Sequence, residues 1–391
     1  MEGDVVVPIL RTSERRDLGR CPQRWWWAWR EGLRERGAEA DALWFGSGIH
    51  EALAAWYCGP GTKRGPHPAE TWQKWADEDM RSIRTVEKWD EEREAVWVDA
   101  KKLGTVMMEG YVKLYGEDEH KLVLSPEMTF SLDVPWPKDQ MLYEETPEGL
   151  LLRYVGTFDS VWRHADTGHI WLDEHKTAGQ IATGHLTLDP QAGSYWAVAG
   201  RYLRDAGKIG PNEQLWGIEY NFMRKALPDD RPKDAEGFAT NKPIKAHYAE
   251  QLSTWLVETP EGRARSPITS SALAKMKLEQ LQGLASGWGV TVIGERSKTQ
   301  PAENFLRYPV HRTRPERNQQ LIRLQKEGLL MQAYRSGILP VTKVPDRTCN
   351  QGAFRCPFFE MCELDEAGGS EAVEDFKQAA FVVRDPYADH R

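Results

Sequence analysis

Two neighbouring segments of the chain carry acidic and basic side chains at spacings that suit hydrolytic chemistry. Asp159 lies in the sequence Gly-Thr-Phe-Asp-Ser, and Glu174 and Lys176 lie in the sequence Leu-Asp-Glu-His-Lys-Thr. Side chains two residues apart on a β-strand point to the same face, so Glu174 and Lys176 share a face. A hairpin that pairs the two segments would bring Asp159 beside Glu174.

Two buried carboxylates that converge in this way repel each other unless a cation neutralises them. A hard divalent ion would do so, because Mg²⁺ and Mn²⁺ prefer oxygen ligands. The ammonium group of Lys176 could then orient an attacking water molecule or hold a phosphate group. The alternative interpretation is a hairpin on the protein surface in which Glu174 and Lys176 form an ordinary salt bridge.

Four further polar residues could join these three. Gln191 and Tyr195 are four residues apart in a predicted helix, so they face the same side. His50 follows Gly46-Ser47-Gly48 at the start of another predicted helix and could supply an imidazole ligand, although a histidine on an amphipathic helix can also be purely structural. Glu127 lies in the first predicted strand and adds another carboxylate.

The five cysteines are unevenly distributed. Cys349, Cys356 and Cys362 cluster near the C-terminal end, whereas Cys21 lies far upstream in the sequence Arg-Cys-Pro. Three clustered cysteines suggest a zinc site that lacks one ligand, and four thiolates suit zinc or an iron–sulfur cluster. If Cys21 is the fourth ligand, the site ties the two ends of the chain together. Cys58 is expected to be a small buried side chain.

Hydrophobic periodicity and turn residues predict the elements that must position these side chains. Helices are expected over 12–36, after the glycine turn at 46–48, over 85–116, over 190–206 and over 315–336. Strands are expected over 122–132, 151–163, 169–177 and 215–224. The second and third strands form an antiparallel hairpin around Asp166-Thr167-Gly168, with Asp159 inside a strand. This order favours an α/β (α+β) fold with a central mixed β-sheet flanked by helices.

The same patterns divide the chain into five parts. They are an N-terminal helical region with Cys21 and His50 (1–120), a core with the two acidic segments (121–224), a mostly helical insertion (225–300), a C-terminal helix with the cysteine loop (301–364) and an acidic tail (365–391).

Composition indicates which partners are expected. The 391 residues carry 51 lysines and arginines against 59 aspartates and glutamates, a net charge of −8, which argues against a protein that coats nucleic acid passively. Two arginine-rich stretches still provide candidates for contact with DNA, namely Arg20, Arg24, Arg312 and Arg314. Most of the 17 tryptophans are expected in the core, and Trp25, Trp26 and Trp27 could instead stack on bases.

The sequence gives no sign of a membrane protein. No apolar run is long enough to span a bilayer, and the first residues lack the basic and apolar regions of a signal peptide. A cytoplasmic protein is therefore expected.

Taken in chain order, the candidate residues resemble those of one known family. The matching motifs are Arg20-Cys21-Pro22, Gly48-Ile49-His50, Glu127, Gly156-Thr157-Phe158-Asp159, Glu174-His175-Lys176-Thr177, Gln191-x-x-x-Tyr195 and Cys349…Cys356-Pro357-x-x-x-x-Cys362. They are similar to motifs of the RecB-like nucleases in the PD-(D/E)xK superfamily, and specifically to its iron–sulfur branch. That branch includes AddB-type nuclease domains, CRISPR-adaptation exonucleases and many phage exonucleases. The resemblance covers residues 11–364.

The resemblance implies a role for each motif. His50, Asp159 and Glu174 would bind the catalytic Mg²⁺ or Mn²⁺, and Lys176 would be the catalytic lysine. Gln191 and Tyr195 would lie near the scissile strand, with Glu127 as an accessory acid. A structural 4Fe–4S cluster would join the two ends of the chain beside a restriction-endonuclease-like core, held by Cys21, Cys349, Cys356 and Cys362. Six residues separate Cys349 from Cys356 where the family often has two, so Zn²⁺ stays open as an alternative.

Two functions follow from the resemblance. The first is a stand-alone, metal-dependent exonuclease that hydrolyses phosphodiester bonds of single-stranded DNA or duplex ends. It would act in recombination, repair or phage DNA processing, alone or with a protein partner. The alternative is an iron–sulfur module of the same fold that binds DNA or a protein partner without cutting. A third class, an iron–sulfur redox enzyme, lacks the expected glycine-rich dinucleotide motif.

Overall fold

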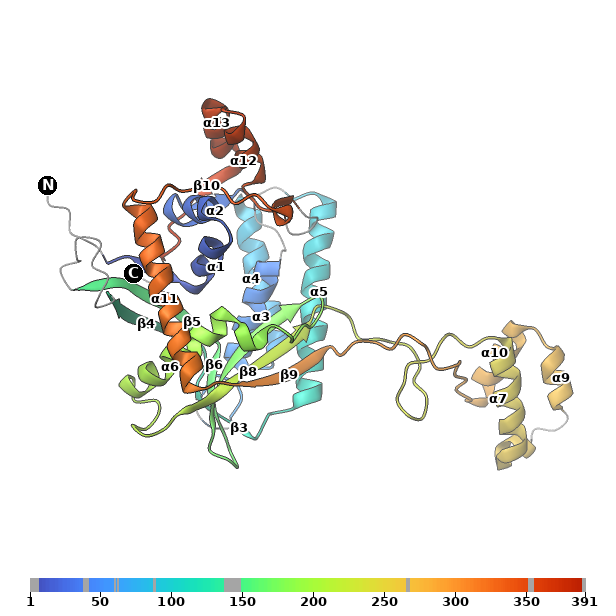
Figure 1. Cartoon of the computed structure of the whole chain (residues 1–391). Helices are drawn as coiled ribbons and strands as arrows, with labels where there is room; N and C mark the ends of the chain where they lie inside the picture. Colours follow the sequence, from blue (N-terminus) through green and yellow to red (C-terminus); the bar gives the residue numbers. More distant parts are fainter. Residues whose placement is uncertain are drawn as a thin grey trace. The chain divides into compact units, whose positions relative to one another are not determined.

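The chain folds into two units of unequal size. The computed structural model describes residues 7–37, 42–59, 61, 63–86, 89–136, 149–264, 268–350 and 355–388. The larger unit comprises Met1–Ala226 and Phe305–Arg391, and the smaller unit comprises Leu227–Asn304 (Figure 1). In the sequence, the smaller unit is thus an insertion between two strands of the larger one.

A five-stranded mixed sheet forms the centre of the larger unit, in the order β3-β6-β7-β8-β9. Its strands are β3 (Lys121–Ser125), β6 (Ser160–His164), β7 (Ile170–Ala178), β8 (Leu215–Arg224) and β9 (Phe305–His311). β7 and β8 are parallel, and the other neighbours are antiparallel. A parallel pair needs a crossover connection, which here contains helix α6 (Pro190–Asp205). The predicted central mixed sheet is confirmed.

A second sheet contains the strand that leads directly to Asp159. It has the order β1-β5-β4, with β1 (Ile9–Arg11) parallel to β5 (Leu150–Phe158) and β4 (Met128–Pro135) antiparallel to it. β5 ends at Phe158 in this sheet and β6 begins at Ser160 in the central sheet, so Asp159 lies at the break between them. The single strand predicted over 151–163 is therefore wrong, because the chain leaves one sheet and enters another.

The strand predicted over 122–132 divides in the same way. β3 belongs to the central sheet and β4 belongs to the second sheet. Glu127 lies in the bend between the two strands rather than inside a strand, and its side chain is exposed.

Helices cover both faces of the central sheet (Figure 1). The helices of the larger unit, taken in chain order, are α1 (Thr12–Arg20), α2 (Pro22–Trp25), the π-helix η1 (Trp26–Arg30), α3 (Ala42–Trp56), α4 (Pro68–Val86), α5 (Glu91–Tyr115), the 3₁₀-helix η2 (Leu186–Leu188), α6, α11 (Arg314–Arg335), the 3₁₀-helix η3 (Arg347–Asn350), α12 (Phe359–Glu366) and α13 (Ser370–Ala380). None of the helices in the described ranges is apolar over a length that would cross a bilayer.

The continuous helix predicted over 12–36 is interrupted. α1 ends at Arg20, Cys21 is extended, and Pro22 starts α2, because proline lacks the N–H that would continue a helix. The tryptophans that follow turn inward: Trp25 is fully buried, and Trp27 and Trp29 are almost so. The indole N–H groups of Trp25 and Trp29 donate to Glu14 and Asp17 of α1. The buried tryptophans therefore do not form the predicted stacking platform for bases.

The predicted glycine turn at 46–48 is also wrong, because these residues lie inside α3. Their role is close packing: a Cβ atom on Gly48 would lie 2.5 Å from the ring of Trp72 on α4. A Cβ atom on Gly104 of α5 would lie 2.2 Å from the same ring. The two glycines let three helices close around one fully buried tryptophan.

Two apolar clusters flank the central sheet. One joins α6 and α11 to Leu172, Ile218, Tyr220 and Phe222 of the sheet. The other joins α3, α4 and α5 to Val123 and Met223. The side chains of β7 and β8 alternate between the two faces of the sheet, as strand geometry requires.

The two ends of the larger unit are fastened together by backbone pairing and aromatic packing. β2 (Leu33–Glu35) pairs with β10 (Phe381–Val383) in an antiparallel ribbon. Phe381 stacks on Phe358, whose ring also contacts Trp27. The segment predicted as an acidic tail thus contains a helix, α13, and a strand that returns to the N-terminal region.

The smaller unit has its own apolar core. It contains α7 (Lys245–Glu258), α8 (Pro260–Arg263), α9 (Ser270–Lys275) and α10 (Leu278–Trp288). Leu252, Leu273 and Leu281 are fully buried in this core, and the indoles of Trp255 and Trp288 stack beside them.

Replacing Phe381 by alanine should weaken the closure of the two ends. The side chain is 3% exposed, so Phe381→Ala should lower the free energy of unfolding by about 3 kcal/mol. Val383 lies in the same strand but is 76% exposed, and Val383→Ala should change that free energy by no more than about 0.5 kcal/mol. Urea denaturation measures both, and equal midpoints for the two variants would contradict the packing role of Phe381.

Candidate active site

The Asp159 carboxylate is held at the break between β5 and β6 by two nitrogen groups. Its Oδ1 lies 3.1 Å from Nδ1 of His50, and its Oδ2 accepts a hydrogen bond of 2.6 Å from the backbone N–H of His175. His50 reaches this point because α3 packs against β7. The sequence expectation that Asp159 lies beside the Glu174 segment holds, although the pairing strand is β6 and not one that contains Asp159.

Glu174 and Lys176 form a second cluster with Gln191. Nζ of Lys176 lies 2.5 Å from Oε1 of Glu174, and Nε2 of Gln191 donates to the same oxygen at 3.0 Å. Gln191 is fixed at the start of α6, where the Asp189 side chain caps the helix by accepting from the Gln191 backbone N–H. Lys176 also donates to Oε1 of Gln191 at 3.3 Å.

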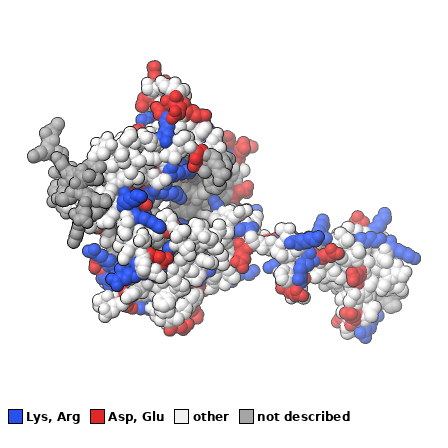
Figure 2. Space-filling model, viewed as in Figure 1, with Lys and Arg blue, Asp and Glu red and all other residues white. Residues whose placement is uncertain are grey.

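Both clusters line one cleft of about 960 Å³. Glu127 and Tyr195 line it as well, so the cleft brings together all seven residues that the sequence selected outside the cysteines and arginines. One wall of the cleft carries Arg11, at the end of β1, and Arg15 and Arg16 of α1. Figure 2 shows Lys and Arg side chains gathered beside a hollow near α1 on this face of the larger unit.

Burial and neighbouring charges set the protonation of the two carboxylates. Burial alone would raise the pKa of Asp159, but His50 and the His175 backbone N–H lower it to about 2. Burial would lower the pKa of His50, but the charge of Asp159 raises it to about 9. Burial raises the pKa of Glu174 to about 7, against the opposing effect of Lys176, and the charge of Asp159 adds to the rise.

The donor set suits a hard divalent ion. Two carboxylates and an imidazole line the cleft, and Oε2 of Glu174 has no donor bonded to it in the described part of the chain. Asp159 raises the pKa of Glu174, so a cation between them would relieve an unfavourable interaction. As the side chains stand, no three His, Cys, Asp or Glu groups of the described residues converge on one point. Each carboxylate is neutralised by a nitrogen group instead.

The backbone N–H of Cys356 donates to the carbonyl of Cys349 at 2.9 Å, although the cysteines of the described residues do not form a group that could hold a metal ion as they stand. Burial raises the pKa of the Cys362 thiol to about 12, and the neighbouring sulfur groups of Cys356, Cys21 and Cys349 contribute to the rise. Nη1 of Arg24 lies 3.8 Å from the sulfur of Cys356. Residues 351–354, between Cys349 and Cys356, lie outside the described residues. Cys58 is exposed rather than buried, contrary to the prediction.

The four arginines predicted to contact DNA do not line the cleft. Arg24 is bound to Asp17, and Arg312 is buried and donates to the carbonyl groups of Leu186 and Thr187. Arg314 is exposed and lines a different cavity, between α6 and α11. Arg20 is exposed at the end of α1.

Sequence reasoning placed DNA contact in the arginine-rich N-terminal stretch but selected Arg20 and Arg24, and other arginines of that stretch line the cleft. Arg16 is exposed on α1, whereas Glu14, Asp17 and Leu18 of the same helix are buried. A helical projection of residues 12–20 does not separate the exposed face from the buried face, because Glu14 and Asp17 are charged yet buried. Their burial follows from their hydrogen bonds to tryptophans, which the projection does not show. Leu43 and Trp75 also line the cleft, and Leu43 is 76% exposed.

Comparison with known families agrees with this geometry. The model of the PD-(D/E)XK nuclease superfamily matches residues 12–363. The chain belongs to the PD-(D/E)XK nuclease superfamily. Members are generally nucleases that act on DNA and usually use Mg²⁺ or Mn²⁺. No curated protein sequence matches this one.

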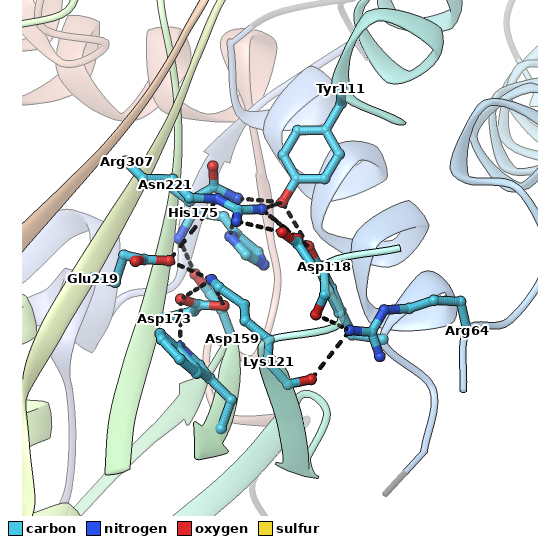
Figure 3. Close-up of polar contacts among 12 residues, drawn as sticks. Arg64, Tyr111, Asp118, Lys121, Asp159, Asp173, His175, Glu219, Asn221 and Arg307 are labelled. Carbon is cyan, nitrogen blue, oxygen red and sulfur yellow. Dashed lines mark hydrogen bonds and ion pairs between the residues drawn. The ribbon is translucent and has the colours of Figure 1, made fainter. Parts of the chain in front are cut away.

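In this superfamily member, a layer of buried polar side chains lies behind the candidate site, between the central sheet and α5 (Figure 3). The outer part of this polar layer is centred on Arg307. The two terminal guanidinium nitrogens, Nη1 and Nη2, bind Asp118 at 2.7 and 2.5 Å, and Nη2 also donates to the hydroxyl of Tyr111. Arg307 lies 3.6 Å above the ring of Tyr115. Lys121 forms the inner part, where it binds Asp173 and Glu219.

Removing Arg307 should destabilise the PD-(D/E)XK fold strongly. Asp118 is 2% exposed, so Arg307→Met leaves a buried carboxylate without its cation and should cost about 3–5 kcal/mol of unfolding free energy. The double variant Arg307→Met/Asp118→Asn removes that charge and should recover part of the loss. Urea denaturation of the three proteins measures this, and a double variant less stable than Arg307→Met would contradict the ion-pair explanation.

Proposed function

We propose that this PD-(D/E)XK protein is a metal-dependent DNA exonuclease that hydrolyses phosphodiester bonds. The observation that carries the proposal is the pair of carboxylates Asp159 and Glu174, whose side chains are only 10% and 4% exposed, beside an ammonium group in one basic-walled cleft. The resemblance to RecB-like exonucleases supports digestion from single-stranded DNA or duplex ends.

The residues of the cleft divide the work of phosphodiester hydrolysis. His50, Asp159 and Glu174 would hold Mg²⁺ or Mn²⁺, which lowers the pKa of a bound water and neutralises charge on the phosphate. Gln191 fixes the orientation of Glu174 by donating to its Oε1. Lys176, 30% exposed through its side chain, extends toward the cleft and would hold the scissile phosphate or the attacking water. Arg16 would bind a neighbouring phosphate, since it is exposed and lines the cleft.

The surroundings of two further residues of the cleft support this division. Tyr195 is 8% exposed and lines the cleft one turn after Gln191, where its burial keeps its pKa well above the ordinary value. Glu127 lies at the rim, where partial burial and the charge of Asp159 raise its pKa. These two residues would bound the space for the scissile strand, with Glu127 as an accessory acid.

We further propose that Cys21, Cys349, Cys356 and Cys362 hold a 4Fe–4S cluster, with Zn²⁺ as the alternative occupant. The backbone hydrogen bond from Cys356 to Cys349 supports this, as does the effect of Cys356, Cys21 and Cys349 on the Cys362 pKa. The site would lie beside the closure of the chain ends, because Cys21 joins α1 to α2 and Cys362 lies in α12. Its role would be structural, in a protein that acts in recombination, repair or phage DNA processing.

The exonuclease proposal is tested with end-labelled linear DNA, single-stranded and duplex, and with circular single-stranded DNA as a substrate without ends. The wild type should shorten linear DNA in Mn²⁺ or Mg²⁺, leave circles intact and be inactive in EDTA. Lys176→Met should lower the rate about 10²–10⁴-fold while DNA binding persists. Lys208→Met, which changes an exposed lysine away from the cleft, is the control and should retain full activity.

Two results would count against this function. Cleavage of circular DNA would identify an endonuclease instead. Binding of DNA without cleavage in any metal would identify the non-cutting module.

The cysteine site is tested by comparing Cys356→Ser with Cys58→Ser after anaerobic purification. Cys356 is one of the candidate ligands and is 9% exposed, whereas Cys58 is exposed and is not a candidate ligand. Cys356→Ser should abolish the brown colour and bound iron and lower the melting temperature, because a tie between the chain ends is lost. Cys58→Ser should keep both. Equal metal content and melting temperature in the two variants would refute the four-cysteine site, and zinc in place of iron would identify the alternative occupant.

A further inference from the structure

The residue between Glu174 and Lys176 belongs to a polar row that crosses three strands. His175 on β7 is the register partner of Asn221 on β8, and Asn221 is the register partner of Arg307 on β9. Strand alternation directs these three side chains to the α5 face, opposite to Glu174 and Lys176. Figure 3 shows the row and its contacts with Tyr111 and Asp118.

Asn221 connects the row to the helices. Its Nδ2 donates to the hydroxyl of Tyr111 at 2.9 Å and lies 3.2 Å from Nδ1 of His175. An amide nitrogen only donates, so Nδ1 of His175 is the acceptor and the ring proton resides on Nε2. Tyr111 is held in turn by the hydroxyl of Tyr57 and by Arg307. The His175 ring is therefore oriented by a chain of fixed groups.

His175 also contacts both members of the Asp159–His50 pair. Its backbone N–H donates to Oδ2 of Asp159 at 2.6 Å, and its ring meets the ring of His50 edge to face, with centroids 5.8 Å apart. The ring orientation of His175 thus determines where the His50 imidazole can lie. The polar row and the cleft meet at this one residue.

The burial of the row indicates a positional role. His175 is 3% exposed and Asn221 is fully buried, and Oδ1 of Asn221 has no hydrogen-bond partner within the described residues. Buried positions usually carry apolar side chains, because an unpaired polar atom costs free energy. Apolar residues in both positions would fill the layer without that cost, but they would not fix the orientation of a ring.

We propose that His175 and Asn221 are positioning residues, which hold His50 and Asp159 in the arrangement that binds the divalent metal. This inference rests on the proposed function, since it concerns the metal site of the same cleft. Groups that orient metal ligands without touching the metal commonly contribute 10-fold to 100-fold to metal affinity or activity, roughly the range expected here.

The test compares His175→Leu, His175→Asn and Asn221→Leu with the wild type. His175→Asn keeps a polar group near the position of Nδ1, whereas His175→Leu does not. Mn²⁺ binding is measured without DNA, from the electron paramagnetic resonance signal of free Mn²⁺, and kcat and KM are measured with linear DNA. Thr240→Val is the control, because it removes one buried hydroxyl that donates to the carbonyl of Pro232 within the smaller unit.

His175→Leu and Asn221→Leu should weaken Mn²⁺ binding and lower kcat by roughly 10-fold to 100-fold, with KM for DNA unchanged. His175→Asn should recover most of the loss, and Thr240→Val should bind Mn²⁺ like the wild type. Unchanged Mn²⁺ affinity in both leucine variants, with a melting temperature lowered no less than in Thr240→Val, would show that the row is only structural and would overturn the proposal.

The failure of the proposed function has a different signature. A wild type whose Mn²⁺ binding is the same as that of Asp159→Asn has no metal site in this cleft, and both proposals then fall. A wild type that binds Mn²⁺ and cuts DNA, beside leucine variants that bind Mn²⁺ equally well, removes only the positioning role.

Discussion

The position of the Asp159 carboxylate depends on the fold at three separate places. The break between β5 and β6 puts the residue between two sheets, β7 supplies the backbone N–H of His175, and α3 supplies His50. α3 in turn lies close enough because Gly48 admits the ring of Trp72 on α4. Without these donors, a buried carboxylate would take up a proton or reach water through local unfolding of the chain. The two sheets and the helix layer thus all contribute to the position of the Asp159 charge.

The two faces of the central sheet solve different problems. On the α6 face, Leu172, Tyr220 and Phe222 pack into an apolar core, and Glu174 and Lys176 extend beyond it at the end of β7. On the α5 face, the same strands carry Asp173, His175, Glu219 and Asn221. That layer is expensive in desolvation and is stable only because Arg307 and Lys121 neutralise its acids. Apolar packing supplies stability on one side, and the polar layer supplies orientation on the other.

The sequence predicts the local chemistry of the site better than its surroundings. The spacing of Glu174 and Lys176 on a strand, and of Gln191 and Tyr195 on a helix, follows from the periods of these elements. The break at Asp159 is not readable, because residues on both sides are equally apolar and strand-forming, and only sheet pairing separates them. Gly46-Ser47-Gly48 reads as a turn because the partner that needs the space, Trp72, is 24 residues away in the sequence.

Charge patterns were the least reliable guide, for a physical reason. An arginine on a helix can contact solvent, DNA or a buried acid, and the sequence does not say which. Arg24 binds Asp17 and Arg15 binds Glu327, so two members of the basic N-terminal stretch are already committed to the fold. Arg16 follows Arg15 directly in α1, yet it lines the cleft. What distinguishes Arg16 from Arg15 and Arg24 is that those two bind acidic side chains of the fold.

The closure of the chain ends is part of the cleft and not only of the fold. The basic wall consists of Arg11 at the end of β1 with Arg15 and Arg16 of α1, and C-terminal groups help to hold it: Arg15 binds Glu327, Arg11 donates to the carbonyl of Pro386, and Glu14 accepts from Tyr387. These partners are more than 300 residues away in the sequence, so the docked C-terminal segment contributes to the position of the wall. A metal at the cysteines would reinforce the same junction, because Cys21 is the C-cap residue of α1. The closure of the chain ends and the placement of this wall of the cleft are therefore one constraint.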